Sequence, residues 1–370
     1  MAIAIILITT LCLAYANGAN DNFKGVATLF GSGTTHYRRA LGWATITTLL
    51  GSLTAVFLAE ILIKSFSGKG LVSPELAATT EYGAAVALGA GLTVLMATWI
   101  GMPISTTHSL VGALVGAGWM ADSAIELEKL GSGFFLPLLV SPVMAFGFAG
   151  VVYPLLSKAR RKLGVHSEVS FYADGEILES AEGLSVLDAC QRVKELNVEN
   201  DREVTFQCSY MGKVCGIDGG TLLDRLHFLS AGMVSFARGL NDTPKIAALL
   251  MLAPALGVFG STALIGMAIA LGGIVSARRV AETMAKKITP MNHGQGFTAN
   301  FITSLIVIGA SRWGLPVSTT HVSCGSLFGI GTITGQGQWS VIGKILAAWI
   351  TTLPLGAALG ALSYLITRSF

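Results

Sequence analysis

The chain contains one polar motif in two copies, NGANDNFK at residues 17–24 and RGLNDTPK at residues 238–245. A second motif is also duplicated, as GMPISTTH at residues 101–108 and GLPVSTTH at residues 314–321. The copies lie 221 residues apart for the first motif (242 − 21) and 213 apart for the second (318 − 105). Duplicated polar motifs that interrupt apolar helices are typical of transporters with internal repeats and a site near the bilayer midplane. The sequence therefore predicts a transporter of this kind.

The composition also indicates a membrane protein. Hydrophobic residues make up 52% of the chain and charged residues 12%, against about 25% charged residues in a typical soluble domain. A helix needs roughly 20 apolar residues to cross the hydrocarbon core. We expect ten membrane segments, some of them broken or re-entrant, at residues 2–30, 40–63, 80–100, 103–120, 134–156, 226–256, 260–277, 296–311, 315–331 and 340–366.

Residues 158–225 interrupt the apolar pattern and divide the chain into three parts. We expect a first membrane repeat at 1–157, an insert at 158–225 and a second membrane repeat at 226–370. Within the insert, partial alternation predicts strands near 168–177 and 203–210, and helical spacing predicts a helix near 185–196. The expected fold is an all-α polytopic membrane protein with a small soluble α/β insert, which is either a compact linker or a regulatory unit.

The placement of basic residues predicts the orientation in the membrane, because Lys and Arg favour the cytoplasmic side. Basic residues cluster at 38–39, 158–162, 225, 278–279 and 286–287. With five segments in each half, this rule places both termini outside and the 158–225 insert in the cytoplasm. An odd number of segments also gives the halves opposite orientations, so the repeats should have inverted topology. The expected location is the plasma (cytoplasmic) membrane.

The first motif is expected to hold a cation. An Asp side chain at the centre of a membrane helix costs roughly 2.5–3.5 kcal/mol, so the pairs Asn20-Asp21 and Asn241-Asp242 require partners. Gly18 and Gly239 permit local unwinding, which would expose backbone carbonyls beside the amide and carboxylate oxygens. These hard oxygen ligands suit Na⁺. The alternative is that Asn and Asp only cap broken helices.

The second motif is expected to bind an oxyanion. Pro is favoured in the first helical turn and Ser or Thr at the N-cap, so this motif predicts the start of a half-helix in each repeat. A helix N-terminus offers unpaired N–H groups and partial positive charge. Capping alone would explain one hydroxyl in each copy, whereas each copy carries three. The candidate phosphate ligands are Ser105, Thr106, Thr107, Ser318, Thr319 and Thr320.

The predicted cation and oxyanion sites are coupled electrostatically. Two carboxylates facing an anion would repel it unless cations lie between them. The two motifs together therefore predict cation-coupled anion transport. Lys24 and Lys245, three residues after each Asp, could steer the anion, but we expect them to extend to the membrane interface instead. His108 and His321 are expected to be hydrogen-bonded residues at the helix starts, with a proton relay as the alternative.

Two further acids occupy matching positions in the halves. Glu60 lies 39 residues after Asp21, and Glu282 lies 40 residues after Asp242. Both are candidates for gating or for an extra cation site, and an interfacial ion pair with nearby arginines is the alternative for Glu282. A channel would need a continuous polar path, and an enzyme would need a nucleophile–base pair, which the motifs do not provide.

These duplicated motifs resemble those of the inorganic phosphate transporter (PiT) family. The resemblance covers both membrane halves, roughly 1–157 and 225–370, with one departure, Gly-Leu rather than Gly-Ala before the second Asn-Asp pair. It implies symport of inorganic phosphate with Na⁺ or H⁺, an inverted-repeat fold and a large cytoplasmic loop. Sulfate permeases of the same superfamily are the nearest competitor. Na⁺ is the expected coupling ion, and no organic cofactor is expected. The expected partners are inorganic phosphate and the lipid bilayer, but not nucleic acid. A homodimer is left open.

Overall fold

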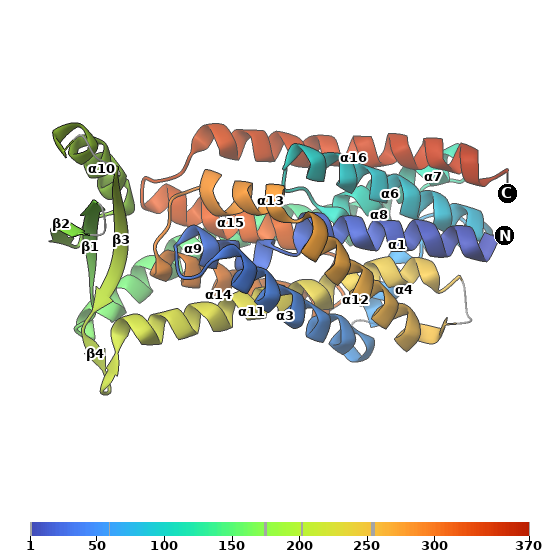
Figure 1. Ribbon diagram of the computed structural model, residues 1–370. Coiled ribbons are helices and arrows are strands. Elements are labelled where there is room, and N and C mark those ends of the chain that lie inside the picture. Colours follow the sequence, from blue (N-terminus) through green and yellow to red (C-terminus); the bar gives the residue numbers. More distant parts are fainter. Residues whose placement is uncertain (1, 59, 174–175, 201–202, 253–255, 370) are drawn as a thin grey trace.

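A long helical bundle carries a small sheet domain at one end (Figure 1). The computed structural model describes residues 2–58, 60–173, 176–200, 203–252 and 256–369. Both chain termini lie at the end of the bundle remote from the sheet domain (Figure 1). Within the described residues, six helical segments are long and apolar enough to cross a membrane: Ala2–Gly31, Tyr37–Leu58, Thr80–Ile100, Leu127–Lys162, Gly257–Ser276 and Trp339–Thr367.

The helices follow the two sequence repeats. The first half contains α1 (Ala2–Asp21), η1 (Lys24–Val26), α2 (Ala27–Gly31), α3 (Tyr37–Leu58), α4 (Glu60–Phe66), α5 (Pro74–Ala77), α6 (Thr80–Ile100), α7 (Thr106–Met120), α8 (Leu127–Leu130), η2 (Gly131–Phe135) and α9 (Leu136–Lys162). The second half contains α11 (Gly219–Leu250), α12 (Gly257–Ser276), α13 (Arg278–Glu282), η4 (Thr283–Lys287), α14 (His293–Arg312), α15 (Thr319–Ile333) and α16 (Trp339–Thr367).

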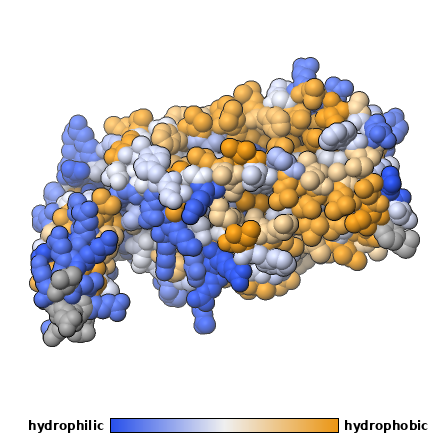
Figure 2. Space-filling view, turned by 90° about the horizontal axis from the view of Figure 1, so that it is seen from above, coloured by the Kyte–Doolittle hydropathy of each residue, from blue (hydrophilic) through white to orange (hydrophobic). Residues whose placement is uncertain are grey.

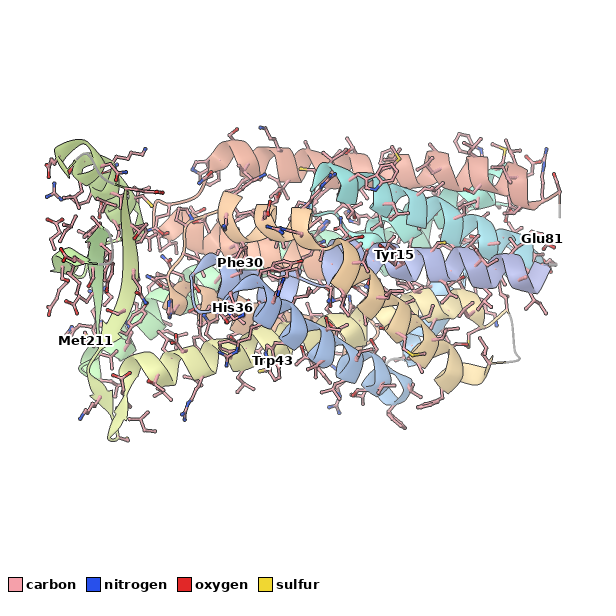
Figure 3. All side chains as sticks on the ribbon, viewed as in Figure 1. Tyr15, Phe30, His36, Trp43, Glu81 and Met211 are labelled. Carbon is pink, nitrogen blue, oxygen red and sulfur yellow. The ribbon has the colours of Figure 1, made fainter. Side chains whose placement is uncertain are left out.

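The packing of these helices is reciprocal between the halves. Helix α1 packs against α6 of its own half and α12 of the other, and α11 packs against α14 and α3 in the same manner. Likewise α7 packs against α16, and α15 against α9. Side-chain bonds reinforce two of these contacts, because Tyr15 Oη lies 2.7 Å from Ser276 Oγ and Trp43 Nε1 donates to the Phe228 carbonyl at 2.8 Å (Figure 3).

Helices α1 and α11 run in opposite directions along the bundle (Figure 1). This antiparallel course agrees with the expected inversion of the repeats, which remains a prediction for the protein in its membrane. The surface agrees with a membrane location: apolar side chains cover much of the helical part, whereas hydrophilic side chains gather on the insert and on the adjoining end of the bundle (Figure 2).

Gly18 and Gly239 serve close packing. A Cβ atom on Gly18 would overlap the carbonyl oxygen of Ile269 in α12, and one on Gly239 would overlap that of Thr48 in α3. Small residues let membrane helices approach in this way. The expected unwinding occurs only in the first copy, where α1 ends at Asp21. In the second copy it is wrong, because α11 continues as a helix from Gly219 to Leu250 with Pro244 inside it.

Several helix bounds differ from the prediction. Helix α9 continues to Lys162 and α11 begins at Gly219, so helices extend into both ends of the range expected for the insert. The described residues of the segment expected at 40–63 belong to α3 and α4, and residue 59 lies outside the described residues. Apolar patterning locates the hydrophobic stretch of a helix, but it does not detect the polar turns by which that helix continues.

The insert is a small α/β unit, as expected. It contains β1 (His166–Ala173), β2 (Glu176–Glu182), α10 (Val186–Asn200), β3 (Val204–Met211), β4 (Lys213–Val214) and β5 (Ile217–Asp218). The first three strands form an antiparallel sheet in the order β2-β1-β3, with Phe171 opposite Phe206. Phe171 and Val169 of β1 pack with Ala189 and Leu196 of α10, so the helix closes a small core. The single strand expected at 168–177 is thus divided between the two strands of a hairpin.

Candidate functional site

The two hydroxyl-rich motifs form helix N-termini with nearly the same geometry. Ser105 is the N-cap of α7 and accepts the His108 N–H at 3.1 Å; Ser318 is the N-cap of α15 and accepts the His321 N–H at 3.2 Å. Gly101, with φ of 77°, ends α6 before the first motif, which allows a sharp reversal toward α7. Local capping preferences therefore produce a short helix start at the same place in each half.

These two helix starts meet each other inside the bundle. Thr107 Oγ1 donates to the Val317 carbonyl at 3.3 Å, and Thr320 Oγ1 donates to the Ile104 carbonyl at 2.8 Å. Each helix start thus contacts the extended segment that precedes the other. Since the first N–H groups of a helix have no acceptor within that helix, the arrangement directs two sets of N–H donors and hydroxyls into one buried region. The six hydroxyl residues predicted to bind an anion are all buried there: Ser105, Thr106, Thr107, Ser318, Thr319 and Thr320.

Lys24 lies at the centre of this region. Its side chain is buried, and Nζ donates to Asn20 Oδ1 at 2.8 Å, Asp21 Oδ1 at 2.5 Å, the Ile104 carbonyl at 2.8 Å and Thr320 Oγ1 at 2.6 Å. The expectation that this lysine extends to the interface is wrong. Four oxygen acceptors from three chain segments satisfy the hydrogen bonds of the ammonium group inside the protein. The side chain therefore does not need to extend to water.

Lys245 occupies the matching place in the second half and is also buried. Its Nζ donates to Thr107 Oγ1 at 2.8 Å and to the Val317 carbonyl at 2.7 Å, and lies 3.6 Å from Asp242 Oδ1. The expectation of an interfacial lysine is wrong here as well. Each lysine therefore binds the Asp of its own half and a threonine of the opposite half.

The Asn-Asp pairs approach these lysines from the end of α1 and the middle of α11. Asn241 Nδ2 donates to Asp242 Oδ1 at 3.0 Å, to the Val317 carbonyl at 3.1 Å and to Thr319 Oγ1 at 3.3 Å. Asn20 Nδ2 donates to Thr98 Oγ1 at 3.0 Å and to the Met102 carbonyl at 3.1 Å. The four predicted cation-binding residues, Asn20, Asp21, Asn241 and Asp242, thus lie beside the two hydroxyl motifs.

Asn17 and Arg238 belong to the same cluster, although the sequence motifs alone gave them no role. Asn17 Nδ2 donates to Asp21 Oδ2 at 3.0 Å, to Asp242 Oδ2 at 3.3 Å and to Thr106 Oγ1 at 3.0 Å. Arg238 is fully buried and donates through Nη1 to Asn17 Oδ1 at 3.2 Å. The signal was present in the sequence, because a residue four positions before each Asp lies on the same face of a helix.

The cluster carries more positive charge than the sequence suggested. It contains three cations (Lys24, Lys245 and Arg238) and two carboxylates (Asp21 and Asp242), all buried, so its formal charge is 3 − 2 = +1. The two carboxylates are not left facing an anion unpaired, since each has a lysine beside it. An anion entering this region would therefore meet fixed cations, helix N-termini and hydroxyl donors.

The two glutamates predicted as gating or cation sites are not brought to this cluster by any described contact. Glu282 is half-exposed, and its Oε1 accepts from Arg278 Nε at 3.3 Å. That contact is an ion pair with a nearby arginine, as in the alternative given for this residue. Glu60 is the first residue of α4, but its side chain lies outside the described residues.

Comparison with known proteins identifies the family. The family model described as the phosphate transporter family matches residues 17–360. The chain belongs to the phosphate transporter family. The expectation of a membrane transporter rather than an enzyme is therefore confirmed, as is the resemblance inferred from the duplicated motifs.

Individual relatives are distant but match along nearly the whole chain. A protein of Pyrococcus abyssi named as a phosphate permease is 27% identical over 97% of this chain and 96% of its own length. A protein of Rhizobium meliloti named as a low-affinity inorganic phosphate transporter is 26% identical over 97% and 94%. A solved structure, named as the sodium-dependent phosphate transporter, matches with a TM-score of 0.75 and 22% identity, covering 100% of this chain and 99% of that one. At this identity the structural match establishes the fold.

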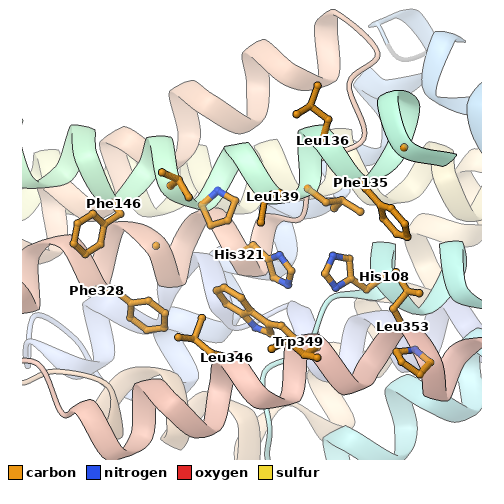
Figure 4. A pocket seen from close by; sticks show the side chains of 17 residues that line it. His108, Phe135, Leu136, Leu139, Phe146, His321, Phe328, Leu346, Trp349 and Leu353 are labelled. Atoms are coloured by element: carbon orange, nitrogen blue, oxygen red, sulfur yellow. The ribbon is translucent and has the colours of Figure 1, made fainter. Parts of the chain in front are cut away.

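This phosphate transporter also has a large, open apolar groove that is distinct from the polar cluster. Its volume is about 1000 Å³, and side chains of α9 and α16 such as Leu139, Phe146 and Leu346 line it. His108 and His321 form its polar floor, with ring centres 4.3 Å apart, beside Trp349 (Figure 4). Their backbone N–H groups are bonded as expected, but His108 Nδ1 and His321 Nε2 have no partner among the described residues. The apolar lining of this groove does not suit phosphate.

Proposed function

We propose that this chain is a symporter that imports inorganic phosphate together with Na⁺. The observation that carries the proposal is the surroundings of Lys24 Nζ, where an amide, a carboxylate, a backbone carbonyl and a hydroxyl oxygen converge on one positive charge. Hard oxygen sets of this composition bind small cations. The structural relative, which is named as a sodium-dependent phosphate transporter, supports the same coupling ion.

Na⁺ would act by replacing the lysines at the carboxylates. Sodium ions bound by Asn20 and Asp21, and by Asn241 and Asp242, would release Lys24 and Lys245 from their Asp partners. Each freed ammonium group already lies within hydrogen-bond distance of a threonine at the opposite helix start, at 2.6 Å for Thr320 and 2.8 Å for Thr107. Cation binding would thereby add positive charge where phosphate binds, and phosphate would in turn favour the cation-bound form.

Phosphate would be held between the starts of α7 and α15. The proposed ligands are the N–H groups and hydroxyls of Ser105, Thr106, Thr107, Ser318, Thr319 and Thr320. Two helix starts suit a tetrahedral anion because they can donate to different oxygens from opposite sides. Hydroxyls can also accept a hydrogen bond from protonated phosphate. Sulfate cannot supply that donor at neutral pH, which favours phosphate over sulfate as the substrate.

Proton coupling is the main alternative. Asp21 and Asp242 could be neutralised by protons instead of by Na⁺, and the lysines would be released in the same manner. Purified protein in liposomes separates the two mechanisms when Na⁺ and H⁺ gradients are imposed one at a time and radiolabelled phosphate uptake is measured. We expect uptake against a phosphate gradient only with inward Na⁺. Uptake that follows the proton gradient in Na⁺-free buffer would contradict sodium coupling, and competition by sulfate as strong as that by phosphate would contradict the substrate.

The proposed orientation places the insert in the cytoplasm and both termini outside the plasma membrane. Cys215 is an exposed thiol in the insert and is a native probe of its side. Burial raises the pKa of the nearby Cys208 thiol to about 11, which makes it slow to react. With the other cysteines replaced, Cys215 should be labelled by a membrane-impermeant maleimide only after cells are opened, and Ser67→Cys on a Cys-free background should be labelled in intact cells. Labelling of both from one side would exclude the proposed topology.

A further inference from the structure

A second pocket lies where the insert meets the helical bundle. Its volume is about 230 Å³, and it shares no lining residue with the phosphate cluster. The lining comes from the end of α9, the start of α11, the first two turns of α14 and the insert. Most of these side chains are apolar, including Leu222, Leu226 and Phe297, and the cationic member is Arg160. The pocket therefore combines a hydrophobic wall with one guanidinium group.

Arg160 has no carboxylate partner among the described residues. Its Cζ atom lies 4.7 Å from the centre of the Tyr210 ring, and its Nη1 atom is buried without a hydrogen-bond acceptor. Asp224, which follows the lining residue Leu223 on α11, contacts a different group, because its Oδ1 lies 2.6 Å from His293 Nδ1. A buried donor of a charged group that lacks an acceptor is costly. An anionic ligand group in the pocket would remove that cost.

The surroundings indicate what kind of anion would enter. Lys158, Arg161 and Lys162 follow one another along the end of α9, and Arg225 lies on α11. Apolar side chains beside this basic group face outward, since Leu163 is 59% exposed and Leu226 is 38% exposed. Positive charge directly beside exposed apolar surface at one end of a membrane bundle matches an anionic amphiphile. Basic pockets between membrane helices bind the headgroups of anionic lipids in this manner.

We propose that this pocket binds an anionic phospholipid, with the headgroup phosphate on Arg160 and part of an acyl chain against Leu222, Leu226 and Phe297. The lipid would join the insert to the bundle. Tyr210, which stacks on Arg160, already accepts a hydrogen bond from the Gly294 N–H of α14 at 3.3 Å. The charge complementarity and the apolar wall favour a lipid over free phosphate. Free phosphate has no apolar part that could pack against the leucines.

Lipid binding can be measured directly on the full-length protein in nanodiscs of phosphatidylcholine with phosphatidylglycerol, by native mass spectrometry. Wild type should retain one phosphatidylglycerol in preference to phosphatidylcholine. Arg160→Gln should weaken that retention about 10- to 100-fold, as expected for the loss of a hydrogen bond to a charged group. The matched control is Arg161→Gln, an exposed arginine on the same helix, which should weaken it by at most about fivefold, the effect of one surface charge near an anionic leaflet.

A second variant tests the apolar half of the site. Leu222→Trp fills the pocket and leaves Arg160 in place, so it should also release the lipid. Both variants should elute as wild type from size exclusion and keep phosphate uptake, because neither residue belongs to the phosphate cluster. Equal retention of phosphatidylglycerol by Arg160→Gln and wild type would overturn the proposal. Displacement of the lipid by millimolar inorganic phosphate would overturn it too, because the ligand would then be the free anion.

Discussion

The two copies of the Asn-Asp motif have similar sequences but different backbone conformations. In the first copy the α-helix ends at Asp21, and Lys24 begins the short 3₁₀ turn η1. In the second copy the whole motif lies inside α11. Lys24 Nζ lies 2.5 Å from Asp21 Oδ1 and has three further oxygen partners. Lys245 Nζ lies 3.6 Å from Asp242 Oδ1 and has two further oxygen partners.

This difference indicates that the two repeats contribute unequally to one site. The first copy provides the richer set of oxygen ligands, and the second provides Arg238, which has Asn17 as its counterpart in the first. The hydroxyl motifs, in contrast, keep the same geometry in both halves. We therefore expect cation binding to depend unequally on the two copies, and anion binding to depend on them equally.

The largest effect should come from the carboxylates. Removing one partner of a buried ion pair costs about 3–5 kcal/mol, which corresponds to roughly two to four orders of magnitude in affinity. Asp21→Asn should therefore raise the Na⁺ concentration needed for half-maximal phosphate uptake by about that factor, and Asp242→Asn by less, because the second copy offers fewer oxygen ligands.

The matched control for this pair is Asp122→Asn, an exposed residue with φ of 55°, a conformation that Asn tolerates. It should leave sodium dependence unchanged. If Asp242→Asn raised the required Na⁺ concentration as much as Asp21→Asn or more, the proposed inequality of the two copies would be wrong.

The next effect concerns the threonines that cross between the halves. Thr107→Ala and Thr320→Ala each remove a hydroxyl that accepts from a lysine of the other repeat. Each should lower phosphate affinity about 10- to 100-fold, since a hydrogen bond to a charged group contributes about 1.5–3 kcal/mol. Equilibrium binding of labelled phosphate measures the change.

Thr93→Ala is the control for the threonines, because Thr93 is buried in α6 and its hydroxyl donates to the Gly89 carbonyl of the same helix at 2.8 Å. It should leave phosphate binding nearly unchanged. Equal contributions from Thr107 and Thr320 would support a shared anion site, and loss of binding with only one of them would show that a single repeat holds the anion.

The smallest effect should be on stability. Gly18→Ala and Gly239→Ala each place a Cβ against a backbone carbonyl of the opposite half, and such overpacking costs about 1–3 kcal/mol. Thermal unfolding in detergent should show both variants melting below wild type. Gly42→Ala in α3, which has open space around it, should melt at or slightly above wild type because Ala favours helix. A normal melting temperature for Gly18→Ala would contradict the close approach of α1 and α12.

Local signals explain what could be predicted from the sequence. Ser105 and Ser318 lie at the helix starts that the motif predicts, because capping depends on residues three positions apart, but Pro103 and Pro316 precede the N-cap instead of lying in the first turn. Strand β3 and helix α10 followed from periodicity in a short polar segment. The duplication of whole motifs in the sequence indicates two repeats that contribute to one polar cluster.

The features that were missed depend on distant partners. Lys24 is held by Ile104 and Thr320, which lie 80 and 296 residues away in the chain, and no local pattern shows that they would satisfy its charge. Helix α11 was expected to unwind, yet Pro244 lies within a continuous helix, which neighbouring groups can support in membrane proteins. Asn17 and Arg238 could have been found, because their four-residue spacing from each Asp was visible in the sequence.

The most direct test of sodium coupling is the affinity of the purified protein for phosphate as a function of Na⁺ concentration at fixed pH and ionic strength. If Na⁺ replaces Lys24 and Lys245 at the carboxylates, phosphate should bind weakly without Na⁺ and progressively more tightly up to about 100 mM, on the order of physiological ionic strength. Phosphate affinity that is unchanged over this range, and that rises instead as the pH is lowered, would contradict the sodium mechanism.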